Sequence, residues 1–215
     1  MINTNDLIEA LVADARAVRR LRPPALRAAK WLLLPALIFG LLIVGHGIRA
    51  DFAFRLHQPD FVLGLAASLA TGVLAAIASF MLDLPDRPRS WALLPVPTLI
   101  LWVVSIGHGC LTQWVEIGHD GMHLGETARC FATVLMTSLP LALAMFAMLR
   151  NGAPSQAGTA TLTGSLAVAA MSASAMSLFH SLDASAMVLL WNLGTALVIV
   201  ALGRSIGPRL LAVGR

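Results

Sequence analysis

Six long stretches without a charged residue constrain the fold of this sequence more than any other feature. Each stretch has about 18 to 22 residues and no Asp, Glu, Lys or Arg; they are residues 31–48, 61–82, 91–109, 131–149, 161–179 and 186–203. About 20 apolar helical residues cross the hydrocarbon core of a membrane. Only 12% of the residues are charged, whereas soluble domains carry about 25%. The sequence therefore predicts an all-α integral membrane protein, a bundle of six transmembrane helices.

The basic residues indicate how the chain crosses the membrane. If the N-terminus is cytoplasmic, 12 of the 15 basic residues lie on the cytoplasmic side, and the outer side holds only Arg49, Arg55 and Arg129. This asymmetry obeys the positive-inside rule. We therefore expect a multi-pass protein of the bacterial inner membrane with both termini in the cytoplasm. The first stretch is expected to remain as a span, because no convincing cleavage site follows it.

The composition of the spans and loops disfavours two classes of function. Ion-coupled transporters usually need ionisable residues near the middle of the membrane, and the six stretches contain no carboxylate, lysine or arginine. The loops are too short to hold a soluble catalytic domain, and no catalytic motif is present. We therefore do not expect an enzyme.

Small residues recur in two of the spans. They are Gly64, Ser68, Gly72 and Ala76 in the second span, and Gly164, Ser165, Ala169 and Ala173 in the fifth. Such residues let helix backbones approach closely in lipid, so they predict packing inside the bundle, with a homo-oligomer interface as the alternative. Three tryptophans are expected in the interfacial aromatic belt: Trp31, Trp91 and Trp114.

The segment before the first span, residues 1–30, is predicted to be a cytoplasmic arm, followed by a six-span sensor domain over residues 31–215. Within the arm, apolar residues recur at spacings of three and four over residues 4–21, which indicates an amphipathic helix. Pro23 and Pro24 are expected to end it. Its apolar face needs a partner, because an isolated helix of this length is marginal in water. Membrane lipid and a groove on a cytoplasmic protein are the two candidates.

The predicted outer side holds all six histidines and both cysteines. Cys110 and Cys130 border the third outer loop, residues 110–130, and the helices joined by this loop are expected to bring them near each other. A permanent disulfide and a reversible thiol pair that senses oxidants are both compatible with this placement. A Zn or Cu site is a third interpretation; its candidate ligands, besides the cysteines, are His108, His119, His123 and His180.

Several short motifs make the chain resemble the NrsF family, the negative regulators of sigma F. The resemblance follows from the order and spacing of these motifs through nearly the whole chain. They are Asp6-Leu7-Ile8, residues 17–24 (AVRRLRPP), Trp91 to Pro95, Gly109-Cys110, Cys130-Phe131, Ser138 to Pro140 and Ala186 to Trp191.

The resemblance implies an anti-sigma factor without enzymatic activity and without direct contact to nucleic acid. Its partner would be an extracytoplasmic-function sigma factor, held by the arm and released when oxidants or heavy metals act on the outer side. The residues expected to bind the sigma factor are Leu7, Ile8, Leu11, Val12, Ala15, Val18, Arg19, Arg20 and Leu21. Cys130 matches a cysteine implicated in sensing. The position of the other family cysteine falls near Ser181, so Cys110 is the candidate for the second thiol.

Two other classes of function remain open from the sequence. One is a small membrane permease or an accessory protein that handles metal. The other is a membrane enzyme of the thiol-exchange type, although no Cys-x-x-Cys motif supports it.

Overall fold

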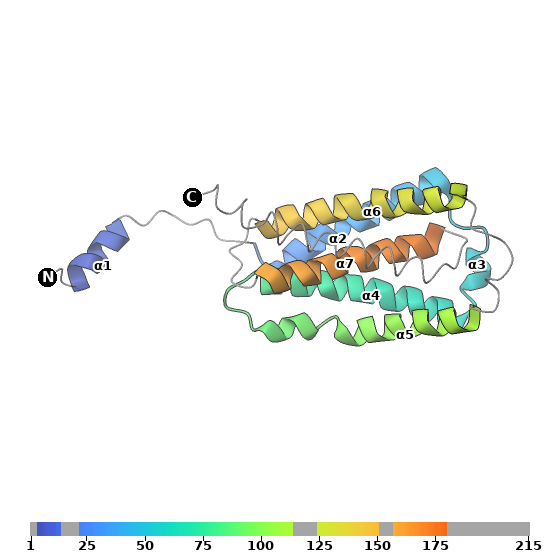
Figure 1. Ribbon diagram of the computed structural model, residues 1–215. Coiled ribbons are helices and arrows are strands. Elements are labelled where there is room, and N and C mark those ends of the chain that lie inside the picture. The colour runs from blue at the N-terminus through green and yellow to red at the C-terminus, as the bar shows by residue number, and fades with distance from the viewer. Residues whose placement is uncertain (1–3, 14–21, 114–123, 151–156, 180–215) are drawn as a thin grey trace.

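The computed structural model describes residues 4–13, 22–113, 124–150 and 157–179, and the secondary structure of these residues is helical (Figure 1). Their helices are α1 (Thr4–Ala13), α2 (Pro24–His46), α3 (Phe52–Arg55), α4 (Pro59–Leu82), the short 3₁₀ helix η1 (Arg89–Leu93), α5 (Val96–Gln113), α6 (Leu124–Arg150) and α7 (Ala157–Phe179). Within these residues, five helices are long and apolar enough to cross a membrane. The predicted all-α class is confirmed, and the predicted sixth span, residues 186–203, lies outside the described residues.

Helices α4 and α7 form the centre of the bundle and pack along each other (Figure 1). A Cβ atom added at Gly72 of α4 would lie 2.8 Å from Cε and 3.1 Å from Cγ of Met171 on α7, so the two helices pack closely at this point. Hydroxyl groups join the same two helices, because Ser68 Oγ lies 2.9 Å from Ser174 Oγ and Ser79 Oγ donates to the carbonyl of Ala160 at 2.8 Å. The small residues of the second and fifth spans thus pack inside the bundle, as predicted.

The other long helices lie around this central pair. Helix α5 packs against α4, whereas α6 packs against α7 and α2. Helices α5 and α6 are consecutive in the sequence, yet they lie on opposite sides of the α4–α7 pair (Figure 1). Neighbours in the sequence are therefore not neighbours in the bundle at this point. This arrangement differs from the expectation that the third and fourth spans are adjacent.

Near prolines, two helices begin at residues other than the first residue of the corresponding apolar stretch. Helix α2 begins at Pro24, seven residues before the first stretch, because proline fits the first turn of a helix, where its missing N–H has no partner to lose. In the third stretch, residues 89–93 form η1 and the long helix begins only at Val96, with Pro97 in its first turn. As a result, Arg27 and Lys30, which the sequence places in the arm, lie within the first spanning helix.

Candidate functional site

At the end of the bundle where the arm begins, charged and aromatic residues from three helices meet. We call this the arm end and define it by Arg27 and Trp31 of α2, Phe80 and Asp83 at the end of α4, and Met148 of α6. Through Arg27 the start of α2 thus contacts the ends of α4 and α6.

Arg27 binds three groups at the arm end. Its Nη1 lies 2.7 Å from Oδ2 of Asp83 in an ion pair whose side chains are 8% and 0% exposed. Its Nη2 donates to the carbonyl of Met148 at 2.6 Å, and the guanidinium carbon lies 4.9 Å from the centre of the Phe80 ring. From the sequence, Arg27 is predicted to be one of several basic residues on the cytoplasmic side. In the structure its side chain is buried between helices.

The environment of Arg27 explains why a cation is held there. Met148 lies in the last turn of α6, where backbone carbonyls lack intrahelical partners and carry partial negative charge. Asp83 directly follows the last residue of α4, where the helix dipole is unfavourable for a carboxylate. Burial raises the pKa of the Asp83 carboxyl, and Arg27 opposes this shift by binding its ionised form. Among the described residues neither carboxylate oxygen of Asp83 makes a well-aligned hydrogen bond, so the close ion pair with Arg27 is the main compensation for its charge.

Trp31 fixes α2 to α6 one turn further along. Its indole Nε1 donates to the carbonyl of Leu141 at 3.2 Å, and the side chain is only 1% exposed. The prediction that Trp31 belongs to an interfacial belt is therefore wrong. From the sequence, a tryptophan at the membrane interface and a tryptophan packed between helices look alike. The structure distinguishes them because it buries the indole N–H against α6.

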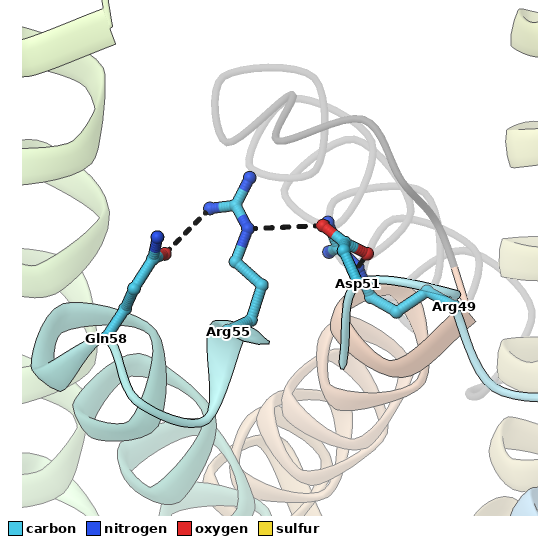
Figure 2. A network of polar contacts seen from close by, with 4 residues as sticks. All are labelled: Arg49, Asp51, Arg55 and Gln58. Atoms are coloured by element: carbon cyan, nitrogen blue, oxygen red, sulfur yellow. Dashed lines mark hydrogen bonds and ion pairs between the residues drawn. The ribbon is translucent and has the colours of Figure 1, made fainter. Parts of the chain in front are cut away.

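A second polar cluster closes the opposite end of the bundle, which we call the loop end (Figure 2). The cluster follows α2 and comprises Arg49, Asp51, Arg55 and Gln58. Nε and Nη2 of Arg49 donate to the two carboxylate oxygens of Asp51 at 2.6 and 2.8 Å. Arg55 donates from Nε to Asp51 at 3.4 Å and from Nη1 to Gln58 Oε1 at 3.2 Å.

The loop end is attached to the central pair of helices. The backbone N–H of Arg49 donates to the carbonyl of Leu178 at the end of α7, at 3.3 Å, and the guanidinium carbon lies 5.8 Å from the centre of the Phe61 ring on α4. The hydrogen bonds from Arg49 are the main cause that lowers the pKa of Asp51 from its ordinary value of 3.8 to about 2. The cluster therefore contains an ionised carboxylate over nearly the whole pH range in which a protein is studied.

The predicted arm helix is present in part, as α1. Helix α1 lies away from the bundle (Figure 1), and two of its apolar side chains are well exposed, Ile8 at 53% and Val12 at 69%. Leu7 and Leu11 also lie in α1, but their side chains are outside the described part of the structure. The remaining candidate sigma-binding residues lie outside the described residues: Ala15, Val18, Arg19, Arg20 and Leu21.

The candidate sensing residues are described only in part. Cys110 lies near the end of α5 and Cys130 in the second turn of α6, so the structure places them on helices that do not neighbour each other. Their side chains are outside the description, and a bond between them remains a prediction.

The predicted metal site is likewise untested. The exposed ring of His108 has its Nδ1 3.8 Å from a carboxylate oxygen of Asp60, while His119, His123 and His180 lie outside the described residues. Within the described ranges no group of three or more potential ligands occurs, whereas a zinc site needs at least three protein ligands.

These features define a multi-pass helical bundle of the kind that spans a membrane, preceded by an exposed amphipathic helix. Residues 11–212 match the model of the NrsF family, described as the negative regulator of sigma F. The chain therefore belongs to the NrsF family. No match was found among curated proteins or among solved structures.

Membership of this family has direct consequences for function. It makes the chain a negative regulator of a sigma factor, with a sigma factor as its partner. It also implies a regulator rather than an enzyme.

Proposed function

We propose that this protein is an anti-sigma factor of the bacterial inner membrane that sequesters an extracytoplasmic-function sigma factor through its N-terminal arm. The observation that carries the proposal is the position of α1, an amphipathic helix whose apolar residues Ile8 and Val12 are exposed and lie away from the bundle. An apolar helix face of this kind gains free energy when it docks into a groove of a protein partner. Family membership names that partner as a sigma factor.

The position of the arm supports the same proposal. Two prolines mark the junction between the arm and the first spanning helix. Pro23 precedes α2, and Pro24 is its first residue. With both termini in the cytoplasm, the arm is on the side where sigma factors bind RNA polymerase. A sigma factor bound to the arm would be held at the membrane and kept away from the polymerase.

The experiment that tests this proposal compares the full chain with a chain that lacks residues 1–22. Both are purified in a mild detergent from unstressed cells of the native host, with membrane levels matched by immunoblot. We expect a small sigma factor to co-purify with the full chain and to be absent from the truncated one. Absence of a sigma factor from both preparations would contradict the proposal, and its retention by the truncated chain would remove the arm as the binding element.

For release, we propose that oxidants or heavy metals act at Cys110 and Cys130 on the outer side. Because α6 is one continuous helix from Leu124 to Arg150, it connects Cys130 with the arm end, where Met148 accepts a hydrogen bond from Arg27. A chemical change at the cysteines would shift α5 and α6 relative to the central pair and alter the presentation of the arm. Such coupling requires two states of the bundle with different affinities for the sigma factor.

The release proposal is tested separately from sigma binding. In the variant Cys110→Ser/Cys130→Ser we expect the sigma factor to stay bound when cells are exposed to a thiol oxidant or to Cu²⁺, whereas the unaltered chain loses it. The variant Ser105→Ala is the control, because it changes a small side chain in the same helix as Cys110 but leaves both cysteines in place. If the double cysteine variant releases the sigma factor normally, the cysteines are not the sensor. Loss of the response to Cu²⁺ on changing His108, His119, His123 or His180 would support a metal site.

A further inference from the structure

The arm end holds two buried charges that neither sigma binding by α1 nor sensing by the cysteines requires. Arg27 lies in the first turn of α2, three residues after the second of the two prolines that join the helix to the arm. Proline fixes its own φ angle, so little rotation is available between the end of the arm and the start of the helix. Whatever fixes the first turn of α2 thus also fixes the direction in which the arm leaves the bundle.

Three independent contacts fix that first turn. Arg27 pairs with Asp83 at 2.7 Å, donates to the carbonyl of Met148 at 2.6 Å and lies over the ring of Phe80 at 4.9 Å. These groups belong to the ends of two different helices, α4 and α6. The planar guanidinium binds both at once because its donors form a rigid fork.

We propose that Arg27 and Asp83 are positioning residues that fix the start of α2 on the ends of α4 and α6, and that the bundle thereby sets how the arm is presented to its partner. This inference rests on the proposed function of the arm. The carbonyl of Met148 is an acceptor that moves with α6, so a displacement of α6 relative to α4 changes the geometry in which Arg27 binds both helices. The hydrogen bond from Trp31 to Leu141 makes α2 follow α6 rather than slide along it.

The buried pair is a sensitive element because the loss of one partner leaves a lone charge. Asp83 is fully buried, and among the described residues neither of its carboxylate oxygens makes a well-aligned hydrogen bond, which leaves the ion pair with Arg27 as its compensation. A buried ion pair contributes little net stability, but an unpaired buried charge is costly. A small change in the relative position of α4 and α6 therefore has a disproportionate effect at Arg27.

The direct test is hydrogen exchange measured by mass spectrometry on the full chain in lipid nanodiscs. In Asp83→Asn we expect the amides of residues 25–30 to exchange at least about tenfold faster, because the ion pair with Arg27 is lost. The amides of residues 67–79, in the centre of α4, should keep their protection. The matched control is Asp86→Asn, which changes an exposed aspartate three residues further on.

A second variant keeps the test decisive if Asp83→Asn fails to accumulate. In Arg27→Met/Asp83→Leu no charge is left unpaired, so folding is not penalised, while all three contacts of Arg27 are still removed. We expect the same faster exchange in residues 25–30. Lys30→Met, which changes an exposed basic residue of the same helix, is its control.

Sigma capture provides the functional measurement. We expect Asp83→Asn and the double variant to co-purify several-fold less sigma factor than the two controls, at equal membrane levels and with an unchanged arm sequence. Three results would each overturn the inference: unchanged exchange in residues 25–30, equally faster exchange in residues 67–79, or unchanged sigma capture. If the chain lacking residues 1–22 still captures the sigma factor, the proposed function fails instead, and the exchange measurement still decides whether the pair fixes α2.

Discussion

Individual side chains at both ends of the bundle make polar contacts that attach the helix ends to one another. At the arm end Arg27 and Trp31 bind α6, and at the loop end Arg49 binds both Asp51 and the carbonyl of Leu178. At the arm end these contacts compensate a fully buried carboxylate, a carbonyl in the last turn of α6 and a buried indole N–H, each of which is costly to leave unpaired. Single substitutions at these positions should therefore have measurable effects of predictable direction.

Replacing Trp31 by Phe should destabilise the protein moderately. The ring remains large and apolar, but the hydrogen bond from Nε1 to Leu141 at 3.2 Å is lost. We expect a cost of about 0.5–1.5 kcal/mol, which corresponds to a fall in Tm of about 2–4 °C for each kcal/mol in a chain of this size. Thermal unfolding in detergent measures it, with Trp102→Phe, on the half-buried side chain in α5, for comparison. An equal Tm for Trp31→Phe and the unaltered chain would contradict a role for this bond.

The cluster at the loop end should depend on pH only in strong acid. The pKa of Asp51 is lowered to about 2, mainly by the hydrogen bonds from Arg49. Its contribution to stability is therefore complete above about pH 4, the range of an unperturbed aspartate, and is lost as the pH falls through about 2. Carboxyl-carbon NMR of the ¹³C-labelled chain in micelles should show a titration near pH 2 that is missing in Asp51→Asn. A titration of this group near pH 4 would mean that the Arg49 contact does not form.

The elements of the bundle differ in how closely they pack, and the small residues of α4 and α7 mark the closest contact. Gly72 faces Met171, and a Cβ at Gly164 would lie 3.0 Å from Cγ of Met145 and 3.1 Å from Oγ of Ser79. By contrast, a Cβ at Gly40 of α2 would meet nothing within 4 Å. Glycines in equally apolar helices thus have different roles that depend on the neighbouring helix.

A larger side chain at position 72 should separate the central pair of helices. We expect Gly72→Val to cost about 1–3 kcal/mol, because overpacking forces side chains and backbone to shift. The matched change Gly40→Val should have little effect. Unfolding of both variants by titration with SDS provides the comparison. A Gly72→Val protein as stable as Gly40→Val would show that α4 and α7 have room to adjust.

Five of the predicted spans could be recognised from the sequence because the lack of charged residues over a membrane thickness is a property of each segment alone. The contacts between segments could not be recognised. Arg27 and Asp83 are far apart in the sequence, and each looks like an ordinary charge just outside an apolar stretch. The order of packing was equally hidden, since the expected pairing of the third and fourth spans fails when α4 and α7 lie between them. Small residues revealed which helices are central, because close approach requires them.

At the scale of the whole molecule, the two ends of the bundle have different charge chemistry. At the loop end, Arg49 and Arg55, two of the three predicted outer arginines, share the carboxylate of Asp51. The predicted cytoplasmic side holds most of the remaining basic residues. Because Asp51 partly neutralises these two arginines, the difference in positive charge between the two predicted sides is larger than the count of basic residues alone suggests. The predicted orientation is based on this difference.

The orientation itself can be tested with reporter fusions to the full chain. Alkaline phosphatase, which is active only outside the cytoplasm, should be inactive when it is fused after Arg215 and active when it is inserted after Gln58. A green fluorescent protein fused after Arg215 should fluoresce. Inactive phosphatase after Gln58 would place the arm on the wrong side for a sigma factor, because one spanning helix separates this loop from the arm, whereas active phosphatase at Arg215 would contradict the cytoplasmic C-terminus.

The pairing of Arg49 with Asp51 also bears on how the chain enters the membrane during synthesis. The two residues are separated by a single position, so their contact needs only the short segment that follows α2 and none of the later helices. In the predicted topology this segment must cross the bilayer when the hairpin formed by α2 and α4 inserts, and an unpaired arginine makes that passage costly. A counter-ion two residues away allows the segment to cross with its charge largely neutralised. If the predicted orientation holds, Arg49 is thus an outer arginine that the biosynthetic machinery can translocate at low cost.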